Sequence, residues 1–190
     1  SSRFCKFLKN DLKKFNTIFT SKETFDVCNY NKMKNFIKNK NIKYLIHIAG
    51  LSRPMDIHEK KINLSIDLNI IGTANIVKLC SEFKIKLIYF STNYVYPGTK
   101  GNYKETDPLL PINNYAWSKL GGESAVQMYK NSLILRVSMT EQPFIHKKAF
   151  CDFKTNFLLK KDVAEILLKL INKKGIINVG GKKQTVYNFV

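Results

Sequence analysis

The chain has 190 residues and a mass of 22.0 kDa, a length that fits one domain, and its hydrophobic content of 44% is enough for a sizeable core. Of its 32 basic residues only three are arginines, so the formal charge of +18 reflects a lysine bias typical of AT-rich coding sequence and argues against a nucleic-acid partner. The four cysteines lack the spacing of a zinc site or a disulfide framework, and no apolar run is long enough to span a bilayer, which predicts a reduced, cytoplasmic protein with no metal and no membrane contact.

Short apolar runs alternate with stretches of helical periodicity, the pattern of strands joined by crossover helices in a mostly parallel α/β sheet. The N-terminal half predicts, in order, an apolar helical stripe over 4–15, a strand at 16–20, a short helix at 33–37, a buried strand at 43–50 and a long helical region over 58–82. Strands follow at 85–92, 132–138 and 175–181, with helices over 115–131 and 160–172. No linker or repeat divides the chain, so we predict one domain over 1–190.

A doubly wound nucleotide-binding fold opens with an apolar strand that runs into a glycine-rich turn, where backbone N–H groups meet the pyrophosphate. Here the first residues already show a helical pattern, and none of the nine glycines precedes Gly50. The first strand and the glycine-rich turn are therefore absent from this sequence. We expect a natural N-terminal segment to supply them, because a sheet without its central strand would leave backbone groups unpaired. The alternative is a protein that has lost the phosphate cradle.

Tyr115 and Lys119, in the stretch INNYAWSK, are the first candidates for chemistry. The chain holds two other Tyr-x-x-x-Lys pairs, so the spacing alone carries little. This pair, however, follows a strand that ends in Thr92, and ligands of parallel sheets bind beyond the carboxyl ends of the strands. Residues i and i+4 share a helix face, so the ammonium of Lys119 is expected to favour the ionised Tyr115 phenol. Such a phenol can exchange a proton with a carbonyl or hydroxyl oxygen that Thr92 holds.

Four motifs in this order resemble the extended short-chain dehydrogenase/reductase family: IHIAG at 46–50, Asn69 to Thr73, FSTNYVYPG at 90–98 and YAWSK at 115–119. The stretch from 91 to 123 most resembles the dTDP-4-dehydrorhamnose reductase branch. The resemblance implies a Rossmann-like, doubly wound α/β fold that uses NAD or NADP and a nucleotide-sugar substrate. It also implies that Tyr115 protonates the sugar carbonyl as hydride arrives, that Lys119 tunes Tyr115 and binds the nicotinamide ribose, and that Thr92 orients the substrate oxygen.

The resemblance implies a cofactor site as well. Ala49 and Gly50 would let the cofactor approach the strand end closely, a use of small residues that steric reasoning also supports. Asp26 and Val27 match the position that borders the adenine, although Asp26 can equally be a turn or helix N-cap residue. Asn69 matches a family position whose effect is mainly structural. The strand at 16–20 lacks a terminal acidic residue for the ribose 2′-OH, which favours NADP weakly.

Departures from the family pattern limit the functional prediction. Dehydratases of the family carry an acidic pair after the threonine, where this chain has Asn93 and Tyr94, so dehydration is not expected. The substrate-binding portion, around 139–190, is shorter than in the family. The sequence therefore predicts reduction of a keto group on a nucleotide-linked deoxysugar, by a possible homodimer. The alternatives are a sugar-nucleotide epimerase and a non-catalytic nucleotide-binding subunit that regulates a partner enzyme.

The histidines and the tryptophan receive structural interpretations. His47 lies within a strand and is expected to be packed and hydrogen-bonded. His58 and His146 lack metal-ligand spacing and are expected to face solvent. Trp117 is expected to pack within the protein, with stacking beside a sugar nucleotide as the alternative.

Overall fold

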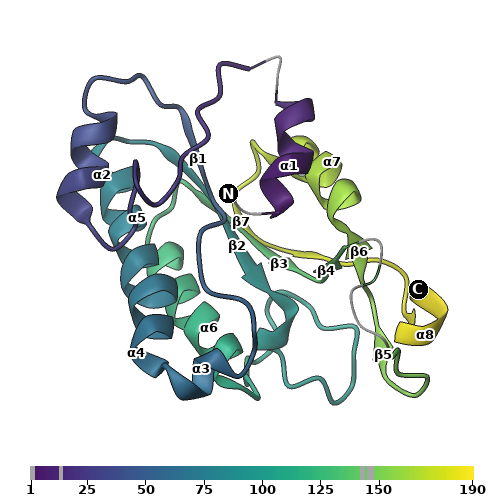
Figure 1. Ribbon diagram of the computed structural model, residues 1–190. Coiled ribbons are helices and arrows are strands. Elements are labelled where there is room, and N and C mark those ends of the chain that lie inside the picture. The colour runs from purple at the N-terminus through teal and green to yellow at the C-terminus, as the bar shows by residue number, and fades with distance from the viewer. Residues whose placement is uncertain (1–2, 13–14, 142–143, 145–147) are drawn as a thin grey trace.

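The structure is a computed structural model that describes residues 3–12, 15–141, 144 and 148–190 (Figure 1). The helical segments are α1 (Arg3–Asp11), α2 (Tyr30–Ile37), α3 (Ile57–Lys60), α4 (Ile62–Ser65), the π-helix η1 (Ile66–Ile71), α5 (Gly72–Glu82), the 3-10 helix η2 (Asn93–Val95), α6 (Asn114–Gln127), α7 (Lys160–Leu170) and α8 (Val186–Phe189). The strands are β1 (Tyr44–His47), β2 (Lys86–Thr92), β3 (Ser132–Val137), β4 (Met139–Thr140), β5 (Lys154–Thr155), β6 (Leu158–Leu159), β7 (Gly175–Val179) and β8 (Gln184–Thr185).

Four parallel strands form the central sheet, in the order β1-β2-β3-β7. Helices α2, α5 and α6 cover one face, and α1 and α7 cover the other (Figure 1). Strands β2 and β3 are buried along their whole length, as expected of parallel strands covered on both sides. The predicted parallel α/β fold is therefore confirmed, and its three layers are those of a Rossmann-like sheet.

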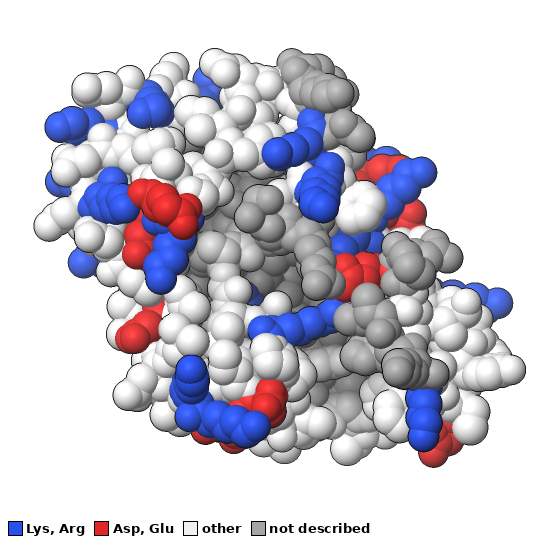
Figure 2. Space-filling model, viewed as in Figure 1, with Lys and Arg blue, Asp and Glu red and all other residues white. Residues whose placement is uncertain are grey.

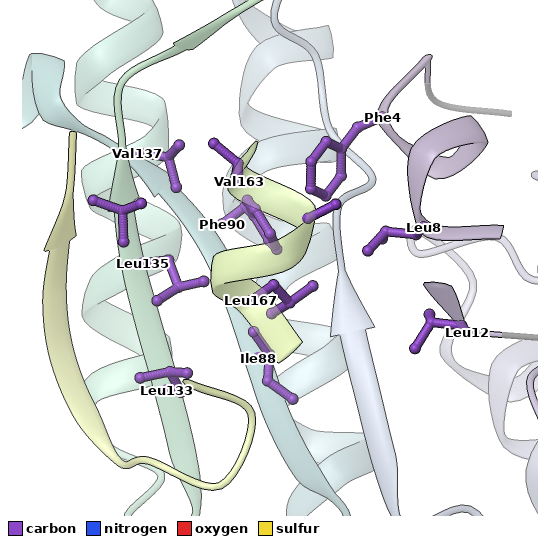
Figure 3. Close-up of a cluster of buried hydrophobic side chains, with 12 residues drawn as sticks. Phe4, Leu8, Leu12, Ile88, Phe90, Leu133, Leu135, Val137, Val163 and Leu167 are labelled. Atoms are coloured by element: carbon purple, nitrogen blue, oxygen red, sulfur yellow. The ribbon is translucent and has the colours of Figure 1, made fainter. Parts of the chain in front are cut away.

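Alternate residues of the strands supply the two hydrophobic cores, because successive side chains of a strand point to opposite faces. On one face, Ile88 and Phe90 of β2 contact the α1 and α7 side chains that include Phe4, Leu8 and Leu167 (Figure 3). On the other face, the cluster under α2, α5 and α6 comprises Val27, Met33, Ile37, Ile76, Leu79, Cys80, Ile85, Leu87, Tyr89, Val126 and Ile134. The N-terminal apolar stripe is thus a core element from Phe4 to Leu12, whereas Phe15 is exposed.

Two predicted elements differ from the structure. The segment 16–20 forms no strand, since its residues are exposed and no neighbouring strand within the described chain pairs with it. The weak preference for NADP rested on that strand and has no support in the structure. The predicted helical region over 58–82 is present but interrupted, because α3 and α4 are short and the six residues of η1 adopt π-helical geometry. Such π-helical turns are frequent at functional sites.

Close packing between α6 and the η1–α5 region depends on Gly122. A methyl group at this position would lie 2.4 Å from the backbone oxygen of Asn69 and 2.8 Å from the hydroxyl of Tyr89. We expect Gly122→Ala to lower the free energy of unfolding by about 2–3 kcal/mol, because the backbone must shift to admit the methyl group. The neighbouring Gly121→Ala is the matched control, since there the methyl group meets only the end of the flexible Ile70 side chain. Urea unfolding of both variants checks this, and equal losses would contradict it.

None of the helices in the described part of the chain is both long and apolar enough to cross a membrane. Within the same residues, no group of three His, Cys, Asp or Glu side chains is placed to hold a metal ion.

Candidate active site

Two segments, the end of β2 and the start of α6, lie at the carboxyl edge of the sheet and carry the predicted catalytic residues. Thr92 is the last residue of β2, and Tyr115 lies in the first turn of α6. The helix begins there because the Asn113 side chain accepts a hydrogen bond of 2.8 Å from the Ala116 backbone N–H, a standard N-cap. One turn further along α6, Lys119 lies on the same face. The Thr92 hydroxyl lies close enough to the Tyr115 phenol to lower its pKa, so these two predicted residues are neighbours.

The phenol of Tyr115 is held in its protonated form. Burial raises its pKa to about 12, and the nearby Thr92 hydroxyl opposes this rise only in part. Two aromatic rings enclose it: the His58 ring centroid lies 5.2 Å from that of Tyr115, and the Tyr94 ring stands perpendicular at 6.2 Å. The predicted lowering of the Tyr115 pKa is therefore wrong for the protein without ligands. A protonated phenol is, however, the form that can donate a proton to a substrate oxygen.

Lys119 does not lower the pKa of Tyr115 as expected, because the Lys119 ammonium lies against another ring. Its Nζ atom is 4.2 Å from the ring centroid of Tyr89, whose hydroxyl donates a hydrogen bond of 3.1 Å to the Lys119 backbone oxygen. Lys119 is only 8% exposed. Burial lowers its pKa to about 7, and the nearby Glu123 carboxylate partly offsets this. Among the described residues, the Lys119 ammonium has no hydrogen-bond acceptor, which leaves its three donors for a ligand.

Lys119 also makes the stability of the fold depend on pH. Its pKa of about 7 in the folded chain lies below the ordinary value of 10.5, so between these values the unfolded chain binds more protons and the free energy of unfolding rises with pH. Between about pH 7 and about pH 9, we expect the wild type to gain about 2 kcal/mol relative to Lys119→Met. Urea unfolding at the two pH values measures the difference. Parallel pH profiles in the two proteins would show that Lys119 has an ordinary pKa.

The predicted cofactor residues after β1 are open to a ligand. Ala49 and Gly50 are both exposed, and they follow directly on the end of the strand. A methyl group at Gly50 would lie 2.7 Å from the Asn69 side-chain oxygen. Asn69 itself is 1% exposed and ties the segment after β1 to α6, through hydrogen bonds with the Leu51 backbone and the Ser118 hydroxyl. Its mainly structural role was implied by the sequence, and these contacts agree with it.

The structure places Asp26 and Val27 in a turn before α2, away from the catalytic residues. The Asp26 carboxylate accepts a hydrogen bond of 3.0 Å from the Cys28 backbone N–H, and Asn29 caps α2 instead. Of the two structural alternatives for Asp26, the turn residue is therefore correct. The side chain of Val27 is buried in the core, and its carbonyl accepts a hydrogen bond of 3.0 Å from Asn75 of α5.

Four minor predictions have different outcomes. His47 is buried, and its Nε2 lies 3.0 Å from the Thr73 hydroxyl, so the prediction of a packed, hydrogen-bonded histidine is confirmed. The prediction for His58 is wrong, because its ring is fully buried against Tyr115 and its Nδ1 lies 2.7 Å from the Ser65 hydroxyl. Trp117 was expected to pack but is 50% exposed, since its position on α6 faces away from the sheet. His146 lies outside the described residues.

Sequence reasoning missed a buried ion pair behind the catalytic residues. The Arg136 guanidinium donates to the Glu123 carboxylate at 2.6 and 3.1 Å, and the Ser91 hydroxyl donates to the same carboxylate at 2.6 Å. Both charged side chains are almost completely buried. The signal was present, because Glu123 follows Lys119 at the same interval of four residues that separates Lys119 from Tyr115. All three side chains therefore share one face of α6.

The chain is similar to known proteins along most of its length. Residues 6–155 match the family model described as the RmlD substrate binding domain. The beta subunit of methionine adenosyltransferase 2 from Xenopus laevis is 38% identical over 94 residues, which are 49% of this chain and 28% of that protein. The chain thus spans less than a third of that curated relative.

Solved structures share the fold over nearly the whole of this chain. A hypothetical dTDP-4-dehydrorhamnose reductase from Sulfolobus tokodaii superposes with a TM-score of 0.86 and 25% identity, over 98% of this chain and 76% of that one. A dTDP-4-dehydrorhamnose reductase from Bacillus anthracis, in complex with NADP, gives a TM-score of 0.90 and 22% identity, over 98% and 74% of the two chains. Together with the family match, these similarities show that the chain belongs to the RmlD substrate-binding domain family, within the extended short-chain dehydrogenase/reductases.

Proposed function

We propose that this chain reduces a keto group on a nucleotide-linked deoxysugar at the expense of NADH or NADPH, as dTDP-4-dehydrorhamnose reductases do. One observation carries the proposal: Thr92 at the end of β2 neighbours Tyr115 in the first turn of α6, with Lys119 one turn further along the same helix face. These residues lie at the carboxyl edge of a parallel sheet, which is where such sheets bind ligands. The family membership supports the same reaction class. Residues 139–190, with the small pairings β4–β6 and β5–β8, would form the reduced substrate-binding portion of a single domain.

The residues suit a reduction in which a carbonyl oxygen must be protonated. Tyr115 carries its proton at neutral pH, since even an ordinary tyrosine has a pKa of about 10 and burial raises this one further, so it can serve as the general acid. Thr92, beside the phenol, is placed to orient the same oxygen. The Lys119 ammonium lies over the Tyr89 ring, so it would stabilise a Tyr115 phenolate only after its side chain turned toward Tyr115 on the same helix face. Together with a hydride added to the carbon, this proton on the oxygen would convert the carbonyl group into an alcohol.

The chain also offers groups that fit a nicotinamide dinucleotide. Ala49 and Gly50 present an exposed, small-residue edge beyond β1, and the unsatisfied ammonium of Lys119 can donate to ribose hydroxyls. When bound, the cofactor would supply the hydride. Asp26 and Val27 would then lie toward the adenine, as the family resemblance implies.

A direct assay tests the proposal. The purified protein is mixed with NADPH or NADH and dTDP-4-dehydrorhamnose, and the loss of reduced cofactor is followed together with formation of the 4-hydroxy sugar. Stoichiometric oxidation of the cofactor supports the reductase. An epimerase, which returns hydride to the substrate, would change the sugar stereochemistry without net consumption. Absence of both reactions, with the protein folded, would overturn the catalytic proposal.

A second candidate function has an observation of its own. The 38% identity to a methionine adenosyltransferase subunit favours a nucleotide-binding subunit that regulates a partner enzyme. Co-purification with a methionine adenosyltransferase catalytic chain, and a change in its activity that does not require Tyr115, would identify this role. If the chain is instead a reductase, replacing Tyr115 should abolish most of its own activity.

A further inference from the structure

A shallow hollow of about 230 Å³ lies at the amino ends of the sheet strands, and four lysines line it: Lys43, Lys84, Lys86 and Lys174. We call it the strand-start hollow. It is remote from the candidate active site, because Lys86 is the first residue of β2 and Thr92 the last, and strand geometry separates the two by roughly 20 Å. Neither the family resemblance nor the proposed reduction uses this end of the sheet.

All four strands of the central sheet contribute to the hollow at the point where each begins. Lys43 precedes β1, Lys84 and Lys86 come just before and at the start of β2, Asn131 precedes β3, and Lys174 precedes β7. On the face drawn in Figure 2, the basic side chains are interspersed with uncharged and acidic ones. Convergence of lysines from three separate segments on one hollow therefore differs from the general lysine excess of the chain.

Hydrogen bonds hold the hollow in a fixed shape. The backbone N–H of Lys86 donates to the Lys43 oxygen at 2.9 Å, and its ammonium donates to the Lys173 oxygen at 2.6 Å. The hydroxyl of Tyr44 donates to the Asn172 side-chain oxygen at 2.8 Å. These contacts join the starts of β1, β2 and β7. A ligand would meet a preformed site and would not have to order these loops.

The charge of the hollow is not neutralised by the protein. No carboxylate lines it, and within the described residues none of its four lysines forms an ion pair. Lys86 is only 7% exposed. Burial and the charge of Lys174 both lower its pKa, which is the expected result of like charges held close together. An anion in the hollow would relieve this repulsion.

We propose that the strand-start hollow is a binding site for a small polyvalent phosphate anion, either a free polyphosphate or the phosphate chain of a nucleotide. Several negative charges on adjacent tetrahedral groups match several ammonium groups around one hollow. The amide groups of Asn131 and Asn172 add neutral hydrogen-bonding partners at its rim. The exposed ring of Tyr44, also at the rim, could stack on a base if the anion belongs to a nucleotide.

Calorimetric titration with inorganic tripolyphosphate tests the site. We expect saturable binding of one anion in the wild type and binding weaker by about tenfold or more in Lys43→Gln/Lys174→Gln, because two charge-assisted contacts are lost. The matched control, Lys38→Gln/Lys161→Gln, removes two exposed lysines outside the hollow and should change the affinity less than about twofold. A parallel titration with ATP separates the two sources, since tighter binding of ATP assigns the site to a nucleotide.

The location of binding is read from backbone amide shifts in nuclear magnetic resonance spectra. Shifts at Asn131 and Gly175 on addition of tripolyphosphate would support the proposal. Shifts confined to Gly50 and Thr92 would instead place the anion at the candidate active site and overturn it. Absence of saturable binding, or equal weakening in both double variants, would also overturn it. None of these outcomes depends on reductase activity, so this proposal and the proposed function can fail separately.

Discussion

Replacing Tyr115 by phenylalanine is expected to lower kcat/KM for keto-sugar reduction by about 100-fold or more, the usual contribution of a positioned general acid. The phenol is the group beside Thr92 at the sheet edge, and burial raises its pKa further above neutral. Phenylalanine retains the ring that packs against His58 and Tyr94. The fold should therefore persist while the proton donor is lost. Steady-state NADPH oxidation, with circular dichroism as a check on folding, measures the effect.

A matched control for this variant is available within the chain. Tyr30 and Lys34 have the same spacing as Tyr115 and Lys119, but both side chains contact the Glu82 carboxylate at the surface. Tyr30→Phe should leave turnover unchanged, because this pair lies on α2 and its polar groups bind the Glu82 carboxylate at the surface. Equal activity of Tyr115→Phe and the wild type would remove Tyr115 from the mechanism. Loss of turnover with an unchanged effect on a partner enzyme would favour a regulatory subunit that has retained the reductase site.

The central sheet could be predicted from the sequence because its strands are mostly apolar. The runs at 43–50, 85–92 and 132–138 are bounded by polar residues and alternate with helical periodicity, so both their location and their parallel arrangement follow from burial on two faces. The segment 16–20 has similar composition but forms no strand. Composition gives the tendency to form a strand, whereas pairing depends on a neighbour that local sequence does not reveal.

The candidate site was predictable only where spacing along one element decides the geometry. Tyr115 and Lys119 share a helix face by their interval of four residues, and Thr92 follows from the end of β2. Protonation could not be predicted in the same way. Whether burial or a neighbouring charge controls the pKa of Tyr115 depends on where the Lys119 ammonium lies, and it lies over the ring of Tyr89. That contact joins β2 to α6, through two residues that lie 30 positions apart in the sequence.

Residues whose role depends on a contact with another element could not be predicted, for the same reason. His58 lies on the short helix α3, and its ring is buried against Tyr115 of α6, a contact between elements that are far apart in the sequence. Hydrophobic periodicity over 58–82 predicts a helix but not the extra residue of a π-turn. Arg136 is a single charge within an apolar strand, and its partner Glu123 is on another element. A charged residue in a strand buried on both faces is nevertheless a signal that a partner must be sought.

The second large effect is expected from breaking the buried Arg136–Glu123 pair. Arg136→Met would leave the Glu123 carboxylate buried with only the Ser91 and Gln127 donors, and an uncompensated buried charge costs about 3–5 kcal/mol. The guanidinium also donates to the Tyr96 hydroxyl at 2.6 Å and to the Glu105 backbone oxygen at 3.0 Å. The loop that follows Thr92 would therefore loosen as well. Urea unfolding should show the loss directly.

A double-mutant cycle tests whether Arg136 and Glu123 stabilise the fold jointly or independently. Glu123→Gln alone should destabilise the fold, because Arg136 then keeps a buried charge without a counterion, whereas Glu123→Gln/Arg136→Met removes both charges and should lose less than the sum of the two single variants. Lys60→Gln is the matched control, since it breaks an exposed ion pair with Asp56 at 2.7 Å and should change stability little. Additive losses at positions 123 and 136 would contradict the coupling. Coupling accompanied by slower turnover would show that the pair fixes the positions of Ser91–Thr92 and α6 relative to each other, because it joins the two elements that carry the candidate catalytic residues.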